Sequence, residues 1–449
     1  MRIKRRLALG LVVALGGLGV GSGVAHAGES VAGSGSTFIK NLFEACIPDY
    51  NDTNSGGDTI SYSGGGSGTG RSNYKAGTSA FAGSDSAWAT ADEPADFTYV
   101  PLIAGPIAIA YKHSGFNGTL KLKPATLAKI FSGAITNWSD ADITADNGSA
   151  VAAKPIIVVY RSDSSGTSEG FTKYLNAAAP TIWTKAGSST FTSSAPSGAP
   201  GGSQGKSGSD GVTNYVASTD GSITYVELSY AKEAAADGVK SISVYNGAGA
   251  YVAPSSVSAA AAVATIPDAN INKTTGFITP DWTSTSAGAY PITIFSFGIA
   301  GTKYSKTNAA VANYFSYVLN TCSKAQASTL GYASLTGATF TFAKQRLALV
   351  GATGAPVATT STTSTSTTST TSTTVAPSLR ATVNVKKTIT LATVAAAAGL
   401  PTAGSSMKIW TNPKNCLVTK ATVKGLKKGT CGVAVSSGTG FRIVTVTVN

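Results

Sequence analysis

The chain contains 449 residues, with 34 Lys and Arg against 21 Asp and Glu, for a formal net charge of +13. The excess of positive charge is confined to the two ends. Residues 28–354 hold 20 basic and 21 acidic residues, whereas residues 378–449 hold 10 basic residues and no acidic residue. This distribution argues against a nucleic-acid-binding protein and indicates a neutral body followed by a basic domain.

The first 27 residues have the pattern of a secretory signal peptide. Residues 1–6 include four basic residues, residues 7–24 are apolar and rich in glycine, and Ala25-His26-Ala27 forms a small-residue cleavage site. The alternative, an uncleaved membrane anchor, is disfavoured by the glycines. Because no cysteine stands at the cleavage site, we expect an exported protein without a lipid anchor, either periplasmic or extracellular at the cell surface.

The four cysteines suit an exported protein. Cys46 and Cys322 lie in the body, and Cys416 and Cys431 lie in the basic domain. Three pairings are possible, and the pairing within each domain, Cys46–Cys322 and Cys416–Cys431, is the one that respects the domain division. We expect no metal site, because His113 is the only histidine after residue 27 and has no neighbouring cysteine.

Strand-like and helix-like segments alternate along the body, residues 28–355. The predicted strands are residues 59–63, 81–85, 99–111, 154–160, 222–226 and 290–297. The predicted helices are residues 38–46, 126–131, 169–175, a segment beginning at 210, 229–236 and 308–319. This alternation predicts an α/β architecture.

Two long apolar strands, far apart in sequence, predict that the body has two lobes. The chain would enter the second lobe near residues 102–112 and return near residues 290–297. Lobe 1 would then comprise about residues 28–105 and 290–355, and lobe 2 about residues 106–289. A ligand would lie between the lobes, at the carboxyl ends of strands and the N-termini of helices.

The rest of the chain is a linker and a small domain. Residues 356–378 are dominated by Ser and Thr, cannot build a core and are predicted to be a linker. Residues 379–449 alternate between apolar and polar residues with turn residues between the runs, which predicts a small all-β, Ig-like sandwich. Its positive charges are either a solvated surface or a contact for anionic wall polymer or lipid headgroups.

Four short polar segments of the body each end a strand or begin a helix: residues 35–38, 64–67, 83–85 and 161–167. Each offers hydroxyl groups and backbone N–H groups, and together they would form an oxyanion site. Arg161 adds a positive charge to the last of them.

Two carboxylates stand in these segments. Asp163 can hold the guanidinium of Arg161 in a fixed orientation. Asp85 would repel an anion, unless the anion still carries a proton that the carboxylate can accept. Sulfate has the same shape but no such proton, so Asp85 would discriminate against it.

These segments carry a family resemblance. In chain order the motifs are Gly-Ser-Gly-Ser-Thr-Phe (33–38), Tyr-Ser-Gly-Gly-Gly-Ser-Gly (62–68), Gly-Ser-Asp (83–85), Ile-Phe-Ser-Gly-Ala-Ile-Thr-Asn-Trp (130–138), Arg-Ser-Asp-Ser-Ser-Gly-Thr-Ser (161–168), Gly-Ser-Ile-Thr-Tyr-Val-Glu (221–227) and Ala-Tyr-Pro-Ile-Thr (289–293). The order resembles PstS, the phosphate-binding protein of the ABC phosphate importer, over about residues 32–347. The resemblance implies a two-lobed periplasmic-binding-protein type II fold.

The resemblance also implies which residues bind inorganic phosphate. The implied ligands are Ser36, Thr37, Phe38 (through its backbone N–H), Ser67, Asp85, Arg161, Ser165, Gly166 and Thr167. Asp85 would accept the proton of the anion, and Asp163 would orient Arg161. The implied partner is the membrane permease that receives the phosphate.

Other functions fit these motifs less well. The glycine-rich segments lack the patterns of nucleotide-binding loops. Ser165 has no nearby base to make it a nucleophile, and a phosphatase would need metal ligands. We therefore expect a monomeric binding protein that is not an enzyme and uses no cofactor. The alternatives are an adhesin for phosphorylated wall polymers and a secreted phosphatase.

Overall fold

The computed structural model describes residues 28–354, 380–384, 387–398, 406–411, 416–419, 422–437 and 440–448. The predicted signal peptide (1–27) and linker (356–378) lie outside these residues. The chain divides into two compact units, Met1–Ala358 and Thr359–Asn449, which are described separately. Every helix in the described residues is too short or too polar to cross a membrane.

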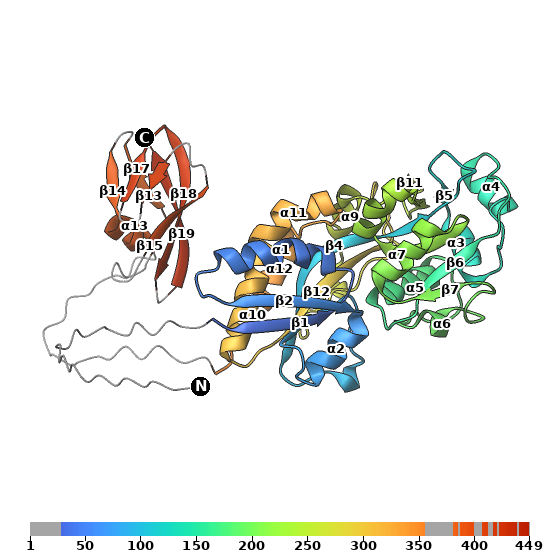
Figure 1. Cartoon of the computed structure of the whole chain (residues 1–449), viewed down its shortest axis with the longest axis horizontal. Coiled ribbons are helices and arrows are strands. Elements are labelled where there is room, and N and C mark those ends of the chain that lie inside the picture. The colour runs from blue at the N-terminus through green and yellow to red at the C-terminus, as the bar shows by residue number, and fades with distance from the viewer. Residues whose placement is uncertain are drawn as a thin grey trace, which may run out of the picture. The chain divides into compact units, whose positions relative to one another are not determined.

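Five strands build the sheet of lobe 1 (Figure 1). They are β1 (Ser30–Gly35), β2 (Thr59–Gly65), β3 (Phe81–Ser84), β4 (Phe97–Tyr111) and β12 (Thr293–Gly301), in the order β2-β1-β3-β12-β4. Strands β2, β1 and β3 run parallel, so their carboxyl ends lie along one edge, as expected for a site at that edge.

Strand β4 is shared by the two lobes. Its residues 97–106 pair with β12, and its residues 107–111 pair with β8 (Ser222–Glu227) of lobe 2. Strands β6 (Ile157–Arg161) and β7 (Gln204–Lys206) complete the path, and β9 (Lys240–Ser241) pairs with β4 beside it. A small sheet of β5 (Lys121–Leu122), β10 (Ser243–Tyr245) and β11 (Tyr251–Val252) lies in lobe 2. The predicted two-lobed α/β fold is thus confirmed.

Helices cover these sheets. Their bounds are α1 (Lys40–Thr53), α2 (Ser67–Lys75), α3 (Pro124–Ser132), α4 (Ala141–Asn147), α5 (Gly166–Ala178), α6 (Phe191–Ser194), α7 (Gly208–Ser218), α8 (Leu228–Glu233), α9 (Ser256–Val263), α10 (Lys306–Tyr317), α11 (Ser323–Leu330) and α12 (Gly337–Leu347). Helix α10 buries Val311, Tyr314 and Phe315 on one face, as its spacing predicts.

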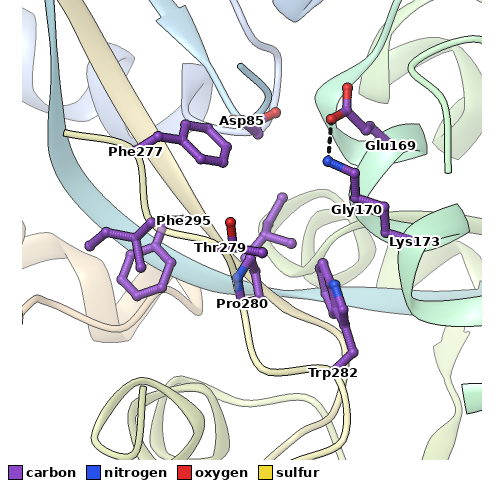
Figure 2. A pocket seen from close by; sticks show the side chains of 11 residues that line it. Asp85, Glu169, Gly170, Lys173, Phe277, Thr279, Pro280, Trp282 and Phe295 are labelled. Atoms are coloured by element: carbon purple, nitrogen blue, oxygen red, sulfur yellow. Dashed lines mark hydrogen bonds and ion pairs between the residues drawn. The ribbon is translucent and has the colours of Figure 1, made fainter. Parts of the chain in front are cut away.

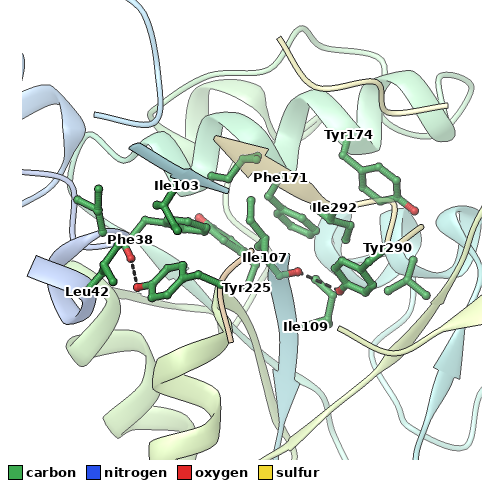
Figure 3. Packing of buried hydrophobic residues seen from close by; sticks show 14 of the residues in the cluster. Phe38, Leu42, Ile103, Ile107, Ile109, Phe171, Tyr174, Tyr225, Tyr290 and Ile292 are labelled. Atoms are coloured by element: carbon green, nitrogen blue, oxygen red, sulfur yellow. Dashed lines mark hydrogen bonds between the residues drawn. The ribbon is translucent and has the colours of Figure 1, made fainter. Parts of the chain in front are cut away.

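The core is continuous across the β4 crossing. Figure 3 shows Ile107 at this point, close to Phe171 and Tyr225, with Tyr290 hydrogen-bonded to it. The hydroxyl of Tyr290 donates to the carbonyl oxygen of Ile107 at 2.9 Å. All four side chains are fully buried, so the crossing point is a packed junction.

One segment lies differently from the predicted lobe division. Residues 256–289, placed in lobe 2 by the sequence, contribute Val263 and Ile278 to a cluster with Tyr99, Phe295 and Phe297 of β4 and β12. The sequence shows which strands are apolar but not which neighbours an intervening segment packs against.

The predicted disulfide between Cys46 and Cys322 is confirmed. It joins α1 to the turn of helix that follows α10, across a sequence separation of 276 residues. The side chain of Cys431 lies outside the described residues, so its pairing with Cys416 stays a prediction.

The described part of the second unit contains two small sheets. One has the order β13 (Arg380–Val383), β19 (Gly440–Val448), β18 (Gly429–Ser437) and β15 (Ser406–Thr411). The other has the order β14 (Thr388–Thr390), β17 (Thr422–Gly425) and β16 (Cys416–Val418). A helix, α13 (Leu391–Ala398), was not predicted from the alternating pattern; its run of alanines has high helix propensity.

Removing the Cys46–Cys322 disulfide should destabilise the body. The double variant Cys46→Ser/Cys322→Ser frees a loop of 276 residues in the unfolded chain. The chain-entropy relation gives a loss of about 5.6 kcal/mol in the free energy of unfolding. Urea unfolding followed by fluorescence measures it. An unchanged midpoint would show that the disulfide does not constrain the unfolded state.

Candidate functional site

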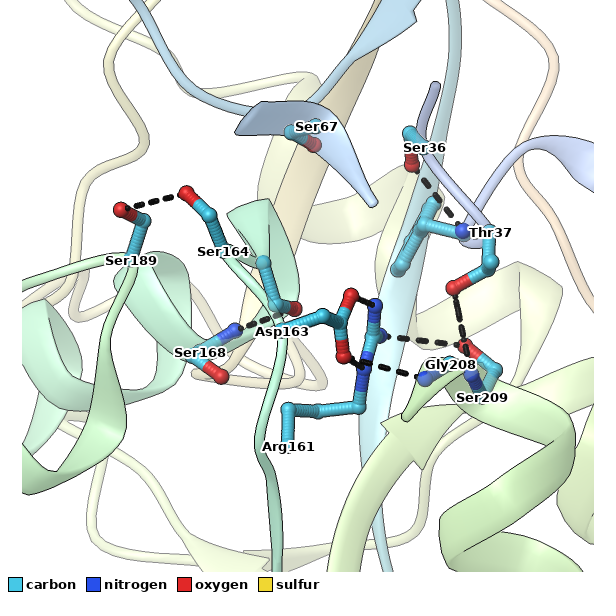
Figure 4. Close-up of polar contacts among 12 residues, drawn as sticks. Ser36, Thr37, Ser67, Arg161, Asp163, Ser164, Ser168, Ser189, Gly208 and Ser209 are labelled. Atoms are coloured by element: carbon cyan, nitrogen blue, oxygen red, sulfur yellow. Dashed lines mark hydrogen bonds and ion pairs between the residues drawn. The ribbon is translucent and has the colours of Figure 1, made fainter. Parts of the chain in front are cut away.

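The four predicted polar segments come together between the lobes. Figure 4 shows residues from three of them. Residues 36–38 follow β1 and Ser67 begins α2 after β2, while Asp85 directly follows β3. From lobe 2, residues 162–165 follow β6 and lead into α5. Each segment is therefore held by a strand on one side, and three of them continue into a helix.

The carboxylate of Asp85 is buried among hydroxyl groups. Ser36 Oγ lies 2.7 Å from both of its oxygens, Ser67 Oγ donates to Oδ2 at 3.2 Å, and Ser296 Oγ donates to Oδ1 at 2.5 Å. Burial raises the pKa of Asp85, although these hydroxyls and the charge of Arg161 oppose the rise. An ionised Asp85 therefore depends on its hydroxyl donors, and a proton shared with a ligand would relieve the same cost.

Arg161 is buried and fixed by Asp163. Its Nε donates to Asp163 Oδ1 at 2.7 Å and its Nη2 donates to Oδ2 at 2.5 Å. Burial alone would raise the pKa of Asp163, but the hydrogen bonds and charge of Arg161 and the N–H of Gly208 hold that pKa below its ordinary value. A bidentate pair of this kind fixes the plane of the guanidinium.

Helix α5 presents its N-terminus to the same space. Ser165 caps the helix by accepting a hydrogen bond from Ser168 N at 3.1 Å. Gly166 and Thr167 occupy the first turn, where backbone N–H groups have no partner within the helix. The hydroxyl of Thr167 is buried and has no hydrogen-bond partner among the described residues. A buried polar group without a partner points to a ligand or water at this position.

The two lobes are in contact around the site. The N–H of Gly68 donates to the carbonyl oxygen of Ser164 at 3.0 Å. A Cβ on Gly166 would lie 2.6 Å from Ser67 Oγ and 2.7 Å from Asp85 Cβ. The glycine at position 166 is therefore required for this close approach.

A pocket opens beside Asp85 (Figure 2). It has a volume of about 300 Å³, including open solvent. It is lined by the aromatic side chains of Phe277 and Trp282 and by Lys173 and Glu169, which form an ion pair. Asp85 is thus one of the residues that line this pocket.

Comparisons with known proteins agree with this geometry. A family model described as a PBP superfamily domain matches residues 20–321. The chain is 34% identical over 303 residues to "Phosphate-binding protein PstS 2" of Mycobacterium tuberculosis, covering 64% of this chain and 78% of that protein. It is 33% identical over 310 residues to "Phosphate-binding protein PstS" of Xylella fastidiosa, covering 68% and 81%. The chain belongs to the PstS family.

Solved structures agree with this membership. The "Crystal structure of DING protein" superposes with a TM-score of 0.57 at 26% identity, covering 70% of this chain and 93% of that chain. The structure of "a human phosphate binding apolipoprotein" superposes with a TM-score of 0.57 at 25% identity and the same coverage. These matches show that the body of this chain shares the fold of these two proteins.

Two of the predicted ligands also make contacts within this PstS-family site. Thr37 Oγ1 lies 2.9 Å from Ser209 Oγ of lobe 2, and Ser209 N donates to Thr37 Oγ1 at 3.2 Å. The backbone N–H of Phe38, expected to face the ligand, donates to Ser36 Oγ at 3.0 Å.

Two serines of the site were not predicted from the sequence. Ser209 contacts both Thr37 and Nη1 of Arg161, the latter at 3.4 Å. Ser296 contacts Asp85 from within the apolar strand β12. Each had a signal: Ser209 follows a glycine at a helix start, and Ser296 is a hydroxyl in an otherwise apolar run.

Glu227 is another buried carboxylate, and it lies outside the group of residues around Asp85 and Arg161. It caps α8 by accepting a hydrogen bond from Ser229 N at 2.9 Å, and Ser229 Oγ also donates to it. Burial raises the pKa of Glu227 to about 8, against the opposing effect of the Ser229 hydrogen bonds. The folded protein therefore favours its protonated form.

The stability of the protein should fall as pH rises between the ordinary pKa of Glu227, 4.5, and its folded value of about 8. The contribution of Glu227 to the free energy of unfolding is fully present below the lower pKa and is lost as pH rises through the upper one. The free energy of unfolding falls by about 1 kcal/mol per pH unit in this range. Glu227→Gln should remove this dependence and be more stable than wild type at pH 9. Thermal melts from pH 5 to 9 measure the difference.

Asp237→Asn, which changes an exposed carboxylate, is the control and should follow the wild-type profile. Parallel profiles for wild type and Glu227→Gln would contradict the assignment.

Proposed function

We propose that this protein captures inorganic phosphate between its two lobes and delivers it to an ABC-type phosphate import permease. The observation that carries the proposal is the buried carboxylate of Asp85 inside a cage of hydroxyl and N–H donors with one guanidinium. The curated relatives named phosphate-binding protein PstS support it.

The proposed ligands come from both lobes. Lobe 1 supplies Ser36, Thr37, Phe38, Ser67 and Asp85, and lobe 2 supplies Arg161, Ser165, Gly166 and Thr167. Arg161 would neutralise charge, while the first turn of α5 would direct N–H groups at the phosphate oxygens. The hydroxyl of Thr167, which has no hydrogen-bond partner among the described residues, would gain one on binding.

Asp85 would distinguish an anion that carries a proton from one that does not. Two buried negative groups in contact repel strongly unless a proton lies between them. Burial already raises the pKa of Asp85, so a proton donated by phosphate would be held in a short hydrogen bond. Sulfate carries no proton at neutral pH and would leave the repulsion uncompensated.

Release would follow separation of the lobes. The contacts Thr37–Ser209 and Gly68–Ser164 both join the lobes, and opening would break them together with the ligand contacts. A permease that favours the open form would therefore lower phosphate affinity by the free energy of opening.

We propose that the protein binds phosphate and does not catalyse a reaction on it. The described residues contain no group of three or more potential metal ligands. His113 uses Nε2 to contact the carbonyl oxygen of Ala152 at 3.0 Å and Nδ1 to accept from Gly115 N at 3.1 Å. Neither nitrogen is available to activate a nucleophile at the cage.

The Asp85→Asn variant tests the site. Wild type should bind phosphate and give no calorimetric response to sulfate. In Asp85→Asn the ratio of phosphate to sulfate affinity should fall by about tenfold or more, because the repulsion of sulfate is removed along with a charged acceptor.

Asp52→Asn, which changes an exposed residue of α1, is the matched control and should behave as wild type. A wild-type chain that ignores phosphate would refute the proposed function. Undiminished selectivity in Asp85→Asn would refute only the role of Asp85.

We also propose that the basic C-terminal unit holds the protein at anionic wall polymer. Residues 378–449 carry ten basic residues and no acidic one. Lys424, Lys427 and Lys428 are exposed on β17 and the turn after it. A surface of this kind attracts polyanions at low salt and loses them as salt screens the charges.

The full chain should sediment with purified cell wall at low salt, and a chain ending at residue 358 should not. Replacing Lys424, Lys427 and Lys428 by Gln should weaken retention, and the same change at the exposed Lys303, Lys306 and Lys324 of the body should not. Equal retention of the full and shortened chains would refute the proposal. Phosphate binding should be the same in both.

A further inference from the structure

Arg71 lies on α2 one helical turn after Ser67 and takes no part in the cage described above. Residues four apart project from the same face of a helix. Ser67 contacts Asp85 through both the carboxylate and the backbone, because its Oγ also accepts from Asp85 N at 3.1 Å. Arg71 contacts the two residues that flank Asp85 in sequence.

The contacts of Arg71 are made by one nitrogen. Its Nη1 donates to Ser84 Oγ at 3.2 Å, to the carbonyl oxygen of Ser86 at 3.1 Å and to Ser86 Oγ. The helix face formed by Ser67 and Arg71 thus hydrogen-bonds to three consecutive residues, 84 to 86.

The hydrogen bonds within this turn are mutually consistent. Ser84 Oγ donates to the carbonyl oxygen of Ser86 at 2.6 Å and accepts from Ser86 N at 3.3 Å. Its remaining lone pair receives Nη1 of Arg71. Ser84 and Ser86 are buried, and a satisfied buried network of this kind is rigid.

The close packing of α2 allows Arg71 to reach the turn. A Cβ on Gly70 would lie 2.6 Å from Gly35 Cα and 2.9 Å from the carbonyl oxygen of Gly83. Glycines at these positions let the helix lie directly against the ends of β1 and β3. A side chain starting at residue 71 then extends along the end of β3 to the turn.

A purely stabilising arginine at the surface of α2 is the ordinary alternative. The hydrogen bonds that Arg71 makes within the described residues go to the turn that carries Asp85, and its guanidinium is partly buried there. Lys75, one turn further along α2, is the contrasting case: it is exposed and lies 3.7 Å from Asp92.

We propose that Arg71 is a positioning residue that, together with Ser67, fixes the Asp85 carboxylate in the orientation that accepts the proton of the bound anion. The inference rests on the proposed phosphate-binding function. Arg71 itself does not touch the ligand; it acts through Asp85.

A double-mutant cycle tests this. Phosphate affinity is measured by calorimetry for the full chain as wild type, Arg71→Gln, Asp85→Asn and the double variant. Arg71→Gln should weaken binding by about tenfold, the loss expected for a charged hydrogen bond. In the Asp85→Asn background the same change should weaken binding by less than about threefold, because the group that Arg71 orients is already altered.

Arg71→Lys keeps one charged donor and should recover part of the affinity, and it carries the comparison if Arg71→Gln does not fold. Lys75→Gln should match wild type. Equal losses in both backgrounds, or unchanged affinity in Arg71→Gln, would overturn the inference and leave the phosphate function standing. A wild-type chain without phosphate affinity would instead refute the function on which the inference rests.

Discussion

A carboxylate removed from water needs donors, and Asp85 takes them from three separate parts of the chain. Ser36 follows β1, Ser67 begins α2 and Ser296 lies within β12. These side chains can meet only because β1, β3 and β12 are neighbours in the sheet. The order of the strands therefore determines which donors surround Asp85. Burying its charge would be unfavourable without these donors, so the site depends on the fold.

The second lobe supplies the opposite charge, Arg161, whose side chain is also held in place. Arg161 is held by Asp163, so its position does not depend on a bound anion. Gly68 and Gly166 let the loops of the two lobes approach to backbone distance. Asp85, Arg161 and Thr167 are therefore buried together, where hydrogen bonds and charge repulsions are stronger than in water.

The two units of the chain differ in charge. The body is nearly neutral and concentrates its functional charges in a small buried volume, where Arg161, Asp163 and Asp85 compensate one another. The C-terminal unit carries ten basic residues and no acidic residue, and its Lys424, Lys427 and Lys428 are exposed. The neutral part and the basic part of the chain are thus separate units.

The sequence by itself determined what depends on local pattern. Alternating segments predicted the two-lobed α/β fold, and strand ends followed by helix starts predicted the four segments that meet at the site. Tertiary structure decided the rest. The sequence marks Ser296 as a hydroxyl in an apolar strand and Arg71 as an arginine on a helix, but it does not say what either side chain contacts. Their roles come from the neighbours that sheet order and helix packing bring to them, which no local periodicity encodes. The same holds for Val263 and Ile278, which pack against side chains of β4 and β12.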